Sequence, residues 1–194
     1  MDLLTRAIQF AAEAHDGARR KGDGSPAVLH AMEAAAVAAT LTGDEEVLAA
    51  AVLHDTVEDA GVQPEELLAR FGPRVAALVA AETENKRRDL PPGDTWRVRK
   101  EETIARLEAE EDPGAAILVL GDKLSNLRSL SRACRQRGEA VWQDFHQHDS
   151  AQHRWYYSAI AAVLAPRLGN TPAFQEYQQR FAEVFGAPDR REEE

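Results

Sequence analysis

The 194-residue sequence lacks several features that would place it in familiar classes of protein. Its single cysteine, Cys134, cannot form an internal disulfide and is typical of a reducing compartment. No run of about 18 apolar residues is present, so we expect no membrane-spanning helix. The first residues also lack the basic start and apolar stretch of a secretory signal. Together these absences predict a soluble, cytoplasmic protein.

Positive charge and phosphate-binding loops are scarce as well. Lysine and arginine number 23 against 33 aspartates and glutamates, which gives a net charge of −10. This balance argues against nucleic-acid and anionic-membrane partners, because both attract basic surfaces. The sequence has no glycine-rich phosphate loop and no Gly-x-Ser-x-Gly nucleophile motif. Any phosphorylated ligand must therefore be held by a local basic cluster.

Helical periodicity covers most of the chain, and we find no strand-like alternation. We expect helices over residues 2–20, 27–41, 44–59, 96–110, 150–168 and 171–185. We also expect a short helix that begins at Pro64, one from Gly72-Pro73 to about residue 82, and one that begins at Asp112-Pro113 and carries Asp122. The length suits one well-buried domain and is too short for two ordinary ones. We therefore predict an irregular all-α fold, with a single domain over residues 1–188 and a disordered tail over 189–194.

Ionisable residues gather at the end of an apolar stretch, as His54-Asp55 followed by Glu58-Asp59. Residues four apart share a helix face, so His54 would stack with Glu58 and Asp55 with Asp59. Carboxylates so close repel one another unless protons or a cation neutralise them. A divalent metal ion is the simplest partner. The alternative is an ordinary solvated helix end before Gly61.

Two further residues are candidate metal ligands. His30 lies near the start of an alanine-rich helix, and Asp122 follows a strongly apolar helical stretch. A mid-helix aspartate has poor helix propensity and is costly to bury, so Asp122 needs a partner, either a salt bridge, a cap or a metal. Two imidazole nitrogens and two carboxylate oxygens suit Mn, Fe or Zn and leave positions open for water. The predicted metal ligands are His30, His54, Asp55 and Asp122.

Glu58 and Asp59 are the candidate catalytic residues. A metal lowers the pKa of a bound water, and an adjacent carboxylate can accept its proton. Their alternative role is that of ordinary helix-end acids. Asn126 lies one helical turn after Asp122, where its amide could bind a substrate oxygen or simply face solvent.

Basic residues form three clusters, at 19–21, at 86–88 within a polar loop over 83–95, and at Arg97, Arg99 and Lys100. Guanidinium groups can bind phosphate oxygens bidentately, although a basic pair on a helix is often only a solvated face. Any of these clusters, Arg19, Arg20 and Lys21 included, could orient a phosphorylated ligand beside a metal. We interpret His146, His148 and His153 as parts of an exposed linker and helix start rather than a second metal site. Residues 155–157 are interpreted as core rather than as a platform for base stacking.

The order of these residues resembles that of the HD-domain phosphohydrolases. More narrowly, the sequence is similar to the hydrolase domains of RelA/SpoT homologues and to the single-domain small alarmone hydrolases. The similarity extends from about residue 7 to 132 and is most specific in Ala-Val-Leu-His-Asp-Thr-Val-Glu-Asp at 51–59 and Gly-Asp-Lys-Leu-Ser-Asn-Leu-Arg at 121–128.

The resemblance implies a Mn(II)-dependent enzyme of the stringent response. It would hydrolyse the 3′-pyrophosphate of ppGpp or pppGpp and release pyrophosphate and GDP or GTP. The implied roles are metal binding by His30, His54, Asp55 and Asp122, water activation by Glu58 and Asp59, and substrate binding by residues 19–21, Lys86 and Asn126. The implied partner is a small phosphorylated nucleotide; the resemblance gives no oligomeric state.

Two segments depart from the family pattern. Residues 26–31 read Pro-Ala-Val-Leu-His-Ala and lack the tyrosine and second proline of Pro-Tyr-x-x-His-Pro. Residues 81–86 read Ala-Glu-Thr-Glu-Asn-Lys, which adds negative charge beside the expected phosphate loop. The alternatives are therefore an HD hydrolase of another nucleotide phosphate and a catalytically silent nucleotide-binding module. The length leaves no room for a synthetase domain.

Overall fold

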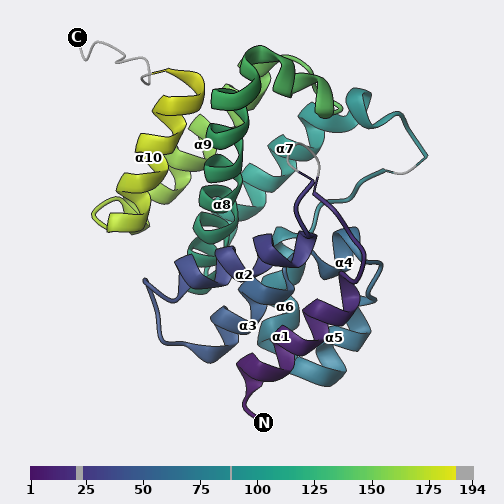
Figure 1. Ribbon diagram of the computed structural model, residues 1–194. Helices are drawn as coiled ribbons and strands as arrows, with labels where there is room; N and C mark the ends of the chain where they lie inside the picture. The colour runs from purple at the N-terminus through teal and green to yellow at the C-terminus, as the bar shows by residue number, and fades with distance from the viewer. Residues whose placement is uncertain (21–23, 88, 187–194) are drawn as a thin grey trace.

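The computed structural model describes residues 1–20, 24–87 and 89–186, and over these residues it contains helices and no β-sheet (Figure 1). The helices are α1 (Leu3–Ala14), α2 (Ala27–Ala38), α3 (Glu45–Leu53), α4 (Thr56–Asp59), α5 (Pro64–Phe71), α6 (Pro73–Glu82), α7 (Pro92–Ala109), α8 (Pro113–Arg137), the 3-10 helix η1 (Gly138–Asp144), α9 (Ser150–Leu168) and α10 (Pro172–Phe185). The predicted all-α fold class is confirmed. Within the described ranges, no helix combines the length and apolar character needed to cross a bilayer.

Side-chain caps begin several of these helices. The Asp44 carboxylate accepts a hydrogen bond from the backbone N–H of Glu46 at 3.0 Å, and Asp112 accepts one from Gly114 at 2.8 Å. Such caps satisfy backbone donors that have no partner inside the helix. Asp112 caps α8, the helix that carries Asp122.

Two hydrophobic clusters make up the core. The alanine cluster joins α1, α2, α3, α5, α6 and α8 and consists mainly of small side chains: Ala7, Ala11, Ala38, Val47, Ala49, Ala50, Ala51, Val52, Leu53, Leu67, Phe71, Val75, Leu78, Val79, Ala115 and Leu118. The aromatic cluster joins α7 to α10 and is built around Trp96, Trp142, Tyr156, Tyr157, Phe174, Tyr177 and Phe181. Figure 1 shows α1, α3 and α5 at one end of the molecule, α9 and α10 toward the other, and α8 between them.

A close approach of α2 and α8 brings candidate site residues together. A Cβ atom placed on Gly121 would lie 2.6 Å from the carbonyl oxygen of Ala34, nearer than side chains tolerate. Glycine at this position therefore lets the two helix backbones come close. Asp122 follows directly on α8, and His30 lies one turn before Ala34 on α2.

The first helix is shorter than the sequence predicted. It ends at Ala14 rather than at residue 20, and Gly17 turns the chain with a φ of 71°, a conformation that glycine adopts without strain. Arg19 and Arg20 therefore follow the helix in an extended segment, where Arg19 forms an isolated β-bridge with Pro26. Lys21 lies outside the described residues.

The helix expected over residues 44–59 is divided into α3 and α4. The Thr56 hydroxyl donates a 2.7 Å hydrogen bond to the carbonyl oxygen of Leu53, at the point where the helix ladder is interrupted. The assumption of one continuous helix is thus wrong at His54 and Asp55. Both residues lie at the junction, which directs their side chains differently from those of a straight helix.

Other boundaries also differ. The helix α7 begins at Pro92 rather than Trp96, because proline is favourable in a first helical turn. The 3-10 helix η1 occupies residues that the sequence did not predict to be helical. The proposed tail at 189–194 lies outside the described residues, and the single-domain boundary stays a prediction.

Candidate metal centre and substrate cavity

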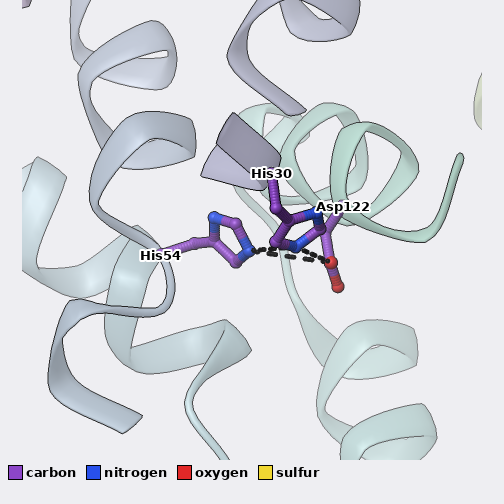
Figure 2. Close-up of side chains that lie close together, drawn as sticks. All are labelled: His30, His54 and Asp122. Carbon is purple, nitrogen blue, oxygen red and sulfur yellow. Dashed lines mark hydrogen bonds and ion pairs between the residues drawn. The ribbon is translucent and has the colours of Figure 1, made fainter. Parts of the chain in front are cut away.

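Three side chains from separate helices point toward one another (Figure 2). His30 comes from α2, His54 from the end of α3, and Asp122 from α8. His30 Nε2 lies 2.9 Å from Asp122 Oδ1 and 3.2 Å from His54 Nε2. Their candidate ligand atoms all lie within 4.8 Å of one another, and all three residues are buried. This spacing is compact enough for one metal ion.

Asp55 borders the same point. Its Oδ2 atom lies 3.3 Å from His54 Nε2 and 3.6 Å from His30 Nε2. Its side chain is 30% exposed, whereas that of Asp122 is 6% exposed. The structure therefore brings together all the residues that the sequence proposed as ligands, and Asp55 lies on the open side.

Hydrogen bonds behind the histidines orient both rings. His54 Nδ1 lies 2.8 Å from the carbonyl oxygen of Ala51, which can only accept, so this nitrogen carries the proton. Ser125 donates its hydroxyl to Glu33 at 2.6 Å and accepts from His30 Nδ1 at 2.8 Å. In the neutral rings, both Nε2 lone pairs consequently face the same point, as metal-binding histidines require.

The electrostatics of the cluster favour a cation. Burial alone would lower the pKa of His54, but the carboxylates of Asp55 and Asp122 raise it well above its usual value. Although burial opposes it, the neighbouring His54 holds the pKa of Asp55 below its ordinary range. A proton on His54 would therefore be held between the imidazole and these carboxylates. A divalent ion could take the place of this proton and lie between the facing lone pairs of the two histidines. The two nitrogen and two carboxylate donors fit such an ion, with Mn, Fe and Zn all compatible.

Asp122 is held from behind by a buried ion network that the sequence analysis missed. Lys123 Nζ bonds to Asp122 Oδ2 and, at 2.8 Å, to Glu82 Oε1. Burial raises the pKa of Glu82 to about 7. A sequence signal was present, since Glu82 continues the apolar helical spacing of Val75, Leu78 and Val79 on α6 and is therefore expected to face inward.

The candidate catalytic carboxylates are joined by a lysine. Lys86 Nζ lies 3.2 Å from Glu58 Oε1 and bonds to Asp59 Oδ1. Glu58 also accepts the backbone N–H of Glu84 at 3.0 Å, and burial raises the pKa of its carboxyl. Asp59 and Lys86 line the same cavity as His30, Asp55 and Asp122. The structure thus places this pair beside the cluster rather than within it.

A cavity of about 480 Å³ opens over the cluster and is also lined by His15, Arg19, Arg20, Asn126, Lys123 and Phe145. Arg20 Nη2 donates to Asn126 Oδ1 at 2.6 Å, and Asn126 Nδ2 donates to Asp122 Oδ1 at 2.6 Å. A basic residue and an amide therefore reach the candidate metal site through one chain of hydrogen bonds. A second cavity of about 580 Å³ shares Asp59, Lys86 and Phe145 with the first.

The HD-domain family matches residues 7–171. This chain belongs to the HD-domain family. The human guanosine-3′,5′-bis(diphosphate) 3′-pyrophosphohydrolase MESH1 is 38% identical over 176 residues, which cover 89% of each protein. A solved structure of a metazoan orthologue of SpoT that hydrolyses ppGpp aligns with a TM-score of 0.76 and 25% identity, over 96% of this chain and 97% of that one. These matches confirm the resemblance to RelA/SpoT-type hydrolase domains.

Some relatives of this HD domain are much longer. The guanosine-3′,5′-bis(diphosphate) 3′-pyrophosphohydrolase of Aquifex aeolicus is 37% identical over 127 residues, which cover 66% of this chain and 18% of that protein. The chain therefore matches about one fifth of the length of this relative. Membership of the HD-domain family implies a divalent metal, and the cluster of His30, His54 and Asp122 is the candidate site for it.

Most of the remaining basic residues of the HD domain already have acidic partners. Arg99 and Lys100 bond to Glu84 at 2.9 and 2.5 Å, and Arg87 bonds to Glu102. Lys86 lines the cavity, and its contact with substrate stays a prediction. Its basic neighbours instead anchor the loop that carries it. Arg88 lies outside the described residues.

His153 belongs to the core of the HD domain. Its ring lies between Trp96 and Trp142, with centroid distances of 5.2 and 4.9 Å, and its Nε2 lies 2.9 Å from the carbonyl oxygen of Gln147. The expectation of an exposed position is therefore wrong for His153, because the apolar faces of these rings cover its imidazole. The neighbouring Tyr156 is buried in the aromatic cluster as well.

Proposed function

We propose that this HD domain is a Mn(II)-dependent hydrolase that removes the 3′-pyrophosphate of ppGpp or pppGpp. The observation that supports this most strongly is the convergence of His30, His54 and Asp122 beside Asp55. Human MESH1, which is similar over 89% of both chains, is named for this reaction. The substrate is a small phosphorylated nucleotide, and the enzyme works in the cytoplasm.

His30, His54, Asp55 and Asp122 would hold the metal ion. When bound, the ion would act as a Lewis acid toward phosphoryl oxygens and lower the pKa of the attacking water. The hydrogen bonds to Ala51 and Ser125 leave the histidine Nε2 atoms free to coordinate. Manganese comes from the family resemblance, because the donor set would also suit iron or zinc.

Glu58 is the proposed general base, with Asp59 as its partner. Burial raises the pKa of Glu58, which strengthens this carboxylate as a proton acceptor near neutral pH. Water attacks the phosphorus attached to the 3′ oxygen, Glu58 accepts the water proton, and the bond from phosphorus to the 3′ oxygen breaks. The 3′ oxygen then takes up a proton, so the products are pyrophosphate and GDP or GTP.

Arg19, Arg20, Lys21, Lys86 and Asn126 are the proposed substrate contacts. Arg20 and Asn126 line the cavity on the side of Asp122, and Lys86 lines it beside Asp59. Since phosphoryl transfer depends mainly on positioning and charge neutralisation, cations on both sides of the metal cluster suit a nucleotide that carries several phosphates.

Hydrolysis of ppGpp by the purified protein, with and without Mn(II), tests this proposal. We expect release of GDP and pyrophosphate that depends on Mn(II) and is absent in Asp55→Ala. Iron and zinc serve as comparison metals, and chromatography identifies the products. The Asp55→Ala protein should also lose bound metal. Absence of turnover in a metal-loaded wild-type protein would contradict the proposal.

One observation favours a second candidate, an HD hydrolase of another nucleotide phosphate. Ala27 lines the cavity at the position where the RelA/SpoT pattern has tyrosine. Alanine in place of tyrosine widens the pocket at this point and removes an aromatic ring that could stack on a nucleotide base. A panel of other phosphorylated nucleotides in the same assay would distinguish the two, because the preferred substrate is the one with the higher kcat/KM.

A further inference from the structure

His15 is a cavity residue to which the reaction described above assigns no role. It caps the end of α1, where its backbone N–H donates to the carbonyl oxygen of Ala11 at 3.0 Å. Its side chain is buried and lines the cavity that also contains His30, Asp55 and Asp122. The cap uses only the backbone of His15 and therefore gives the imidazole no role.

The Nε2 atom of His15 is buried and has no hydrogen-bond partner among the described residues. Leaving a buried polar atom unpaired is costly, and proteins rarely do so without a functional reason. Burial lowers the pKa of His15, although the nearby charges of Asp55 and Asp59 oppose this effect. The ring is therefore neutral near pH 7 and can offer one N–H donor.

We propose that His15 binds substrate, and that its Nε2 donates a hydrogen bond to a phosphate oxygen of the nucleotide in this cavity. The proposal rests on the proposed function, since it takes the substrate to be a phosphorylated nucleotide. Phosphate oxygens accept hydrogen bonds and do not donate them. The cavity wall carries the acids Asp55, Asp59 and Asp122. A phosphate bound there is repelled by these carboxylates, so a further N–H donor such as His15 would help to hold it.

A neutral imidazole suits this position better than another cation would. A cationic side chain beside the candidate metal site would bond to Asp55 or Asp59, as Lys86 does with Asp59. His15 forms no such ion pair in the described structure, so its donor stays available for a ligand. It would add a directional contact without adding charge that competes with the metal.

Two substitutions separate this role from a structural one. His15→Gln keeps an N–H group near the position of Nε2, whereas His15→Leu fills similar space without a donor. Affinity for inorganic pyrophosphate, measured by calorimetry on Mn(II)-loaded protein, should fall roughly tenfold in His15→Leu and stay near the wild-type value in His15→Gln. The kcat/KM for ppGpp should follow the same order. His148→Gln, which changes an exposed histidine outside the cavity, is the control.

Metal content and thermal stability complete the experiment. The free His15→Leu protein should melt at or above the wild-type temperature, because the substitution removes an unpaired buried atom. Its metal content should not change. Unchanged pyrophosphate affinity in His15→Leu, an equal loss in His15→Gln, or loss of metal would each overturn the proposal. If wild type binds pyrophosphate through His15 but does not hydrolyse ppGpp, the proposed substrate fails and the assignment of His15 is supported.

Discussion

The alanine cluster and the aromatic cluster share α8 but fill space in different ways. Alanines such as Ala49, Ala50 and Ala51 let helix backbones approach closely, and the metal cluster lies at the edge of this region. The aromatic cluster instead packs large rings, as where Phe174 stacks on Tyr177 at a centroid distance of 5.9 Å. Small side chains thus bring polar groups from different helices within bonding distance, whereas large rings hold helices apart.

Both regions contain buried polar atoms, and only some of these atoms are paired. In the aromatic cluster, the Tyr177 hydroxyl donates to the carbonyl oxygen of Tyr157 at 2.7 Å. In the described part of the chain, the Tyr156 hydroxyl of the same cluster is buried without a hydrogen-bond partner, as are His15 Nε2 and Glu82 Oε2 near the candidate metal site. Unpaired atoms lower stability in either region, but of these three residues only His15 lines the cavity over the candidate metal site, where a ligand could reach it.

The largest effect is expected for a substitution of the proposed base, at the end of the molecule that contains the alanine cluster. Glu58→Gln should keep its metal and lower kcat by about 10²–10⁴-fold, because the proposed base can no longer accept a proton. Steady-state kinetics and metal analysis measure this, with Glu65→Gln on the exposed surface of α5 as the control. Normal turnover in both Glu58→Gln and Asp59→Asn would remove the water-activating role.

A second substitution tests whether close packing creates the site. Gly121→Ala should destabilise the protein by about 1–3 kcal/mol, because the added methyl group meets the carbonyl oxygen of Ala34. It should also weaken metal binding by displacing Asp122. Gly43→Ala is the matched control, since a Cβ there has nothing within 4 Å. Chemical denaturation and metal titration give the comparison, and equal effects of the two substitutions would contradict the packing argument.

The buried carboxyl of Glu82 should make the metal-free protein sensitive to pH. Its folded pKa of about 7 lies above the ordinary 4.5, so its contribution to stability is complete below about pH 4.5 and is lost as pH rises through 7. Between pH 5 and 7.5 the free energy of unfolding of the wild-type protein should fall by at most about 2 kcal/mol more than that of Glu82→Gln. Urea denaturation in the presence of a chelator, repeated across this pH range, measures the free energy of unfolding of both proteins. Parallel pH dependences would exclude this role for Glu82.

The smallest effect is expected in the aromatic cluster. Tyr177→Phe should lower the free energy of unfolding by about 1 kcal/mol, through loss of the hydrogen bond to Tyr157. Because this bond lies outside the cavity, kcat and KM should stay at wild-type values. A large change in either kinetic constant would show that the two regions are more tightly coupled than their packing indicates.

Local patterns predicted much of this molecule. The cap at Asp44 and the helices over α9 and α10 follow from short-range signals, namely an aspartate before a helical stretch and apolar residues at helical spacing. The ends of α1 and α3 were predicted less well. The turn at Gly17 and the competing Thr56 hydroxyl are single-residue features that periodicity does not detect.

The sequence by itself determined the helical class, the family and the residue types from which a metal site can be built. Only the tertiary structure decided that His30, His54 and Asp122 meet, since they lie on separate helices and Gly121 lets two of those helices approach. It also decided that Arg99 and Lys100 pair with Glu84 and that His15 faces the cavity. Pairing of charges depends on distances between segments far apart in the chain, and helical periodicity carries no information about those distances.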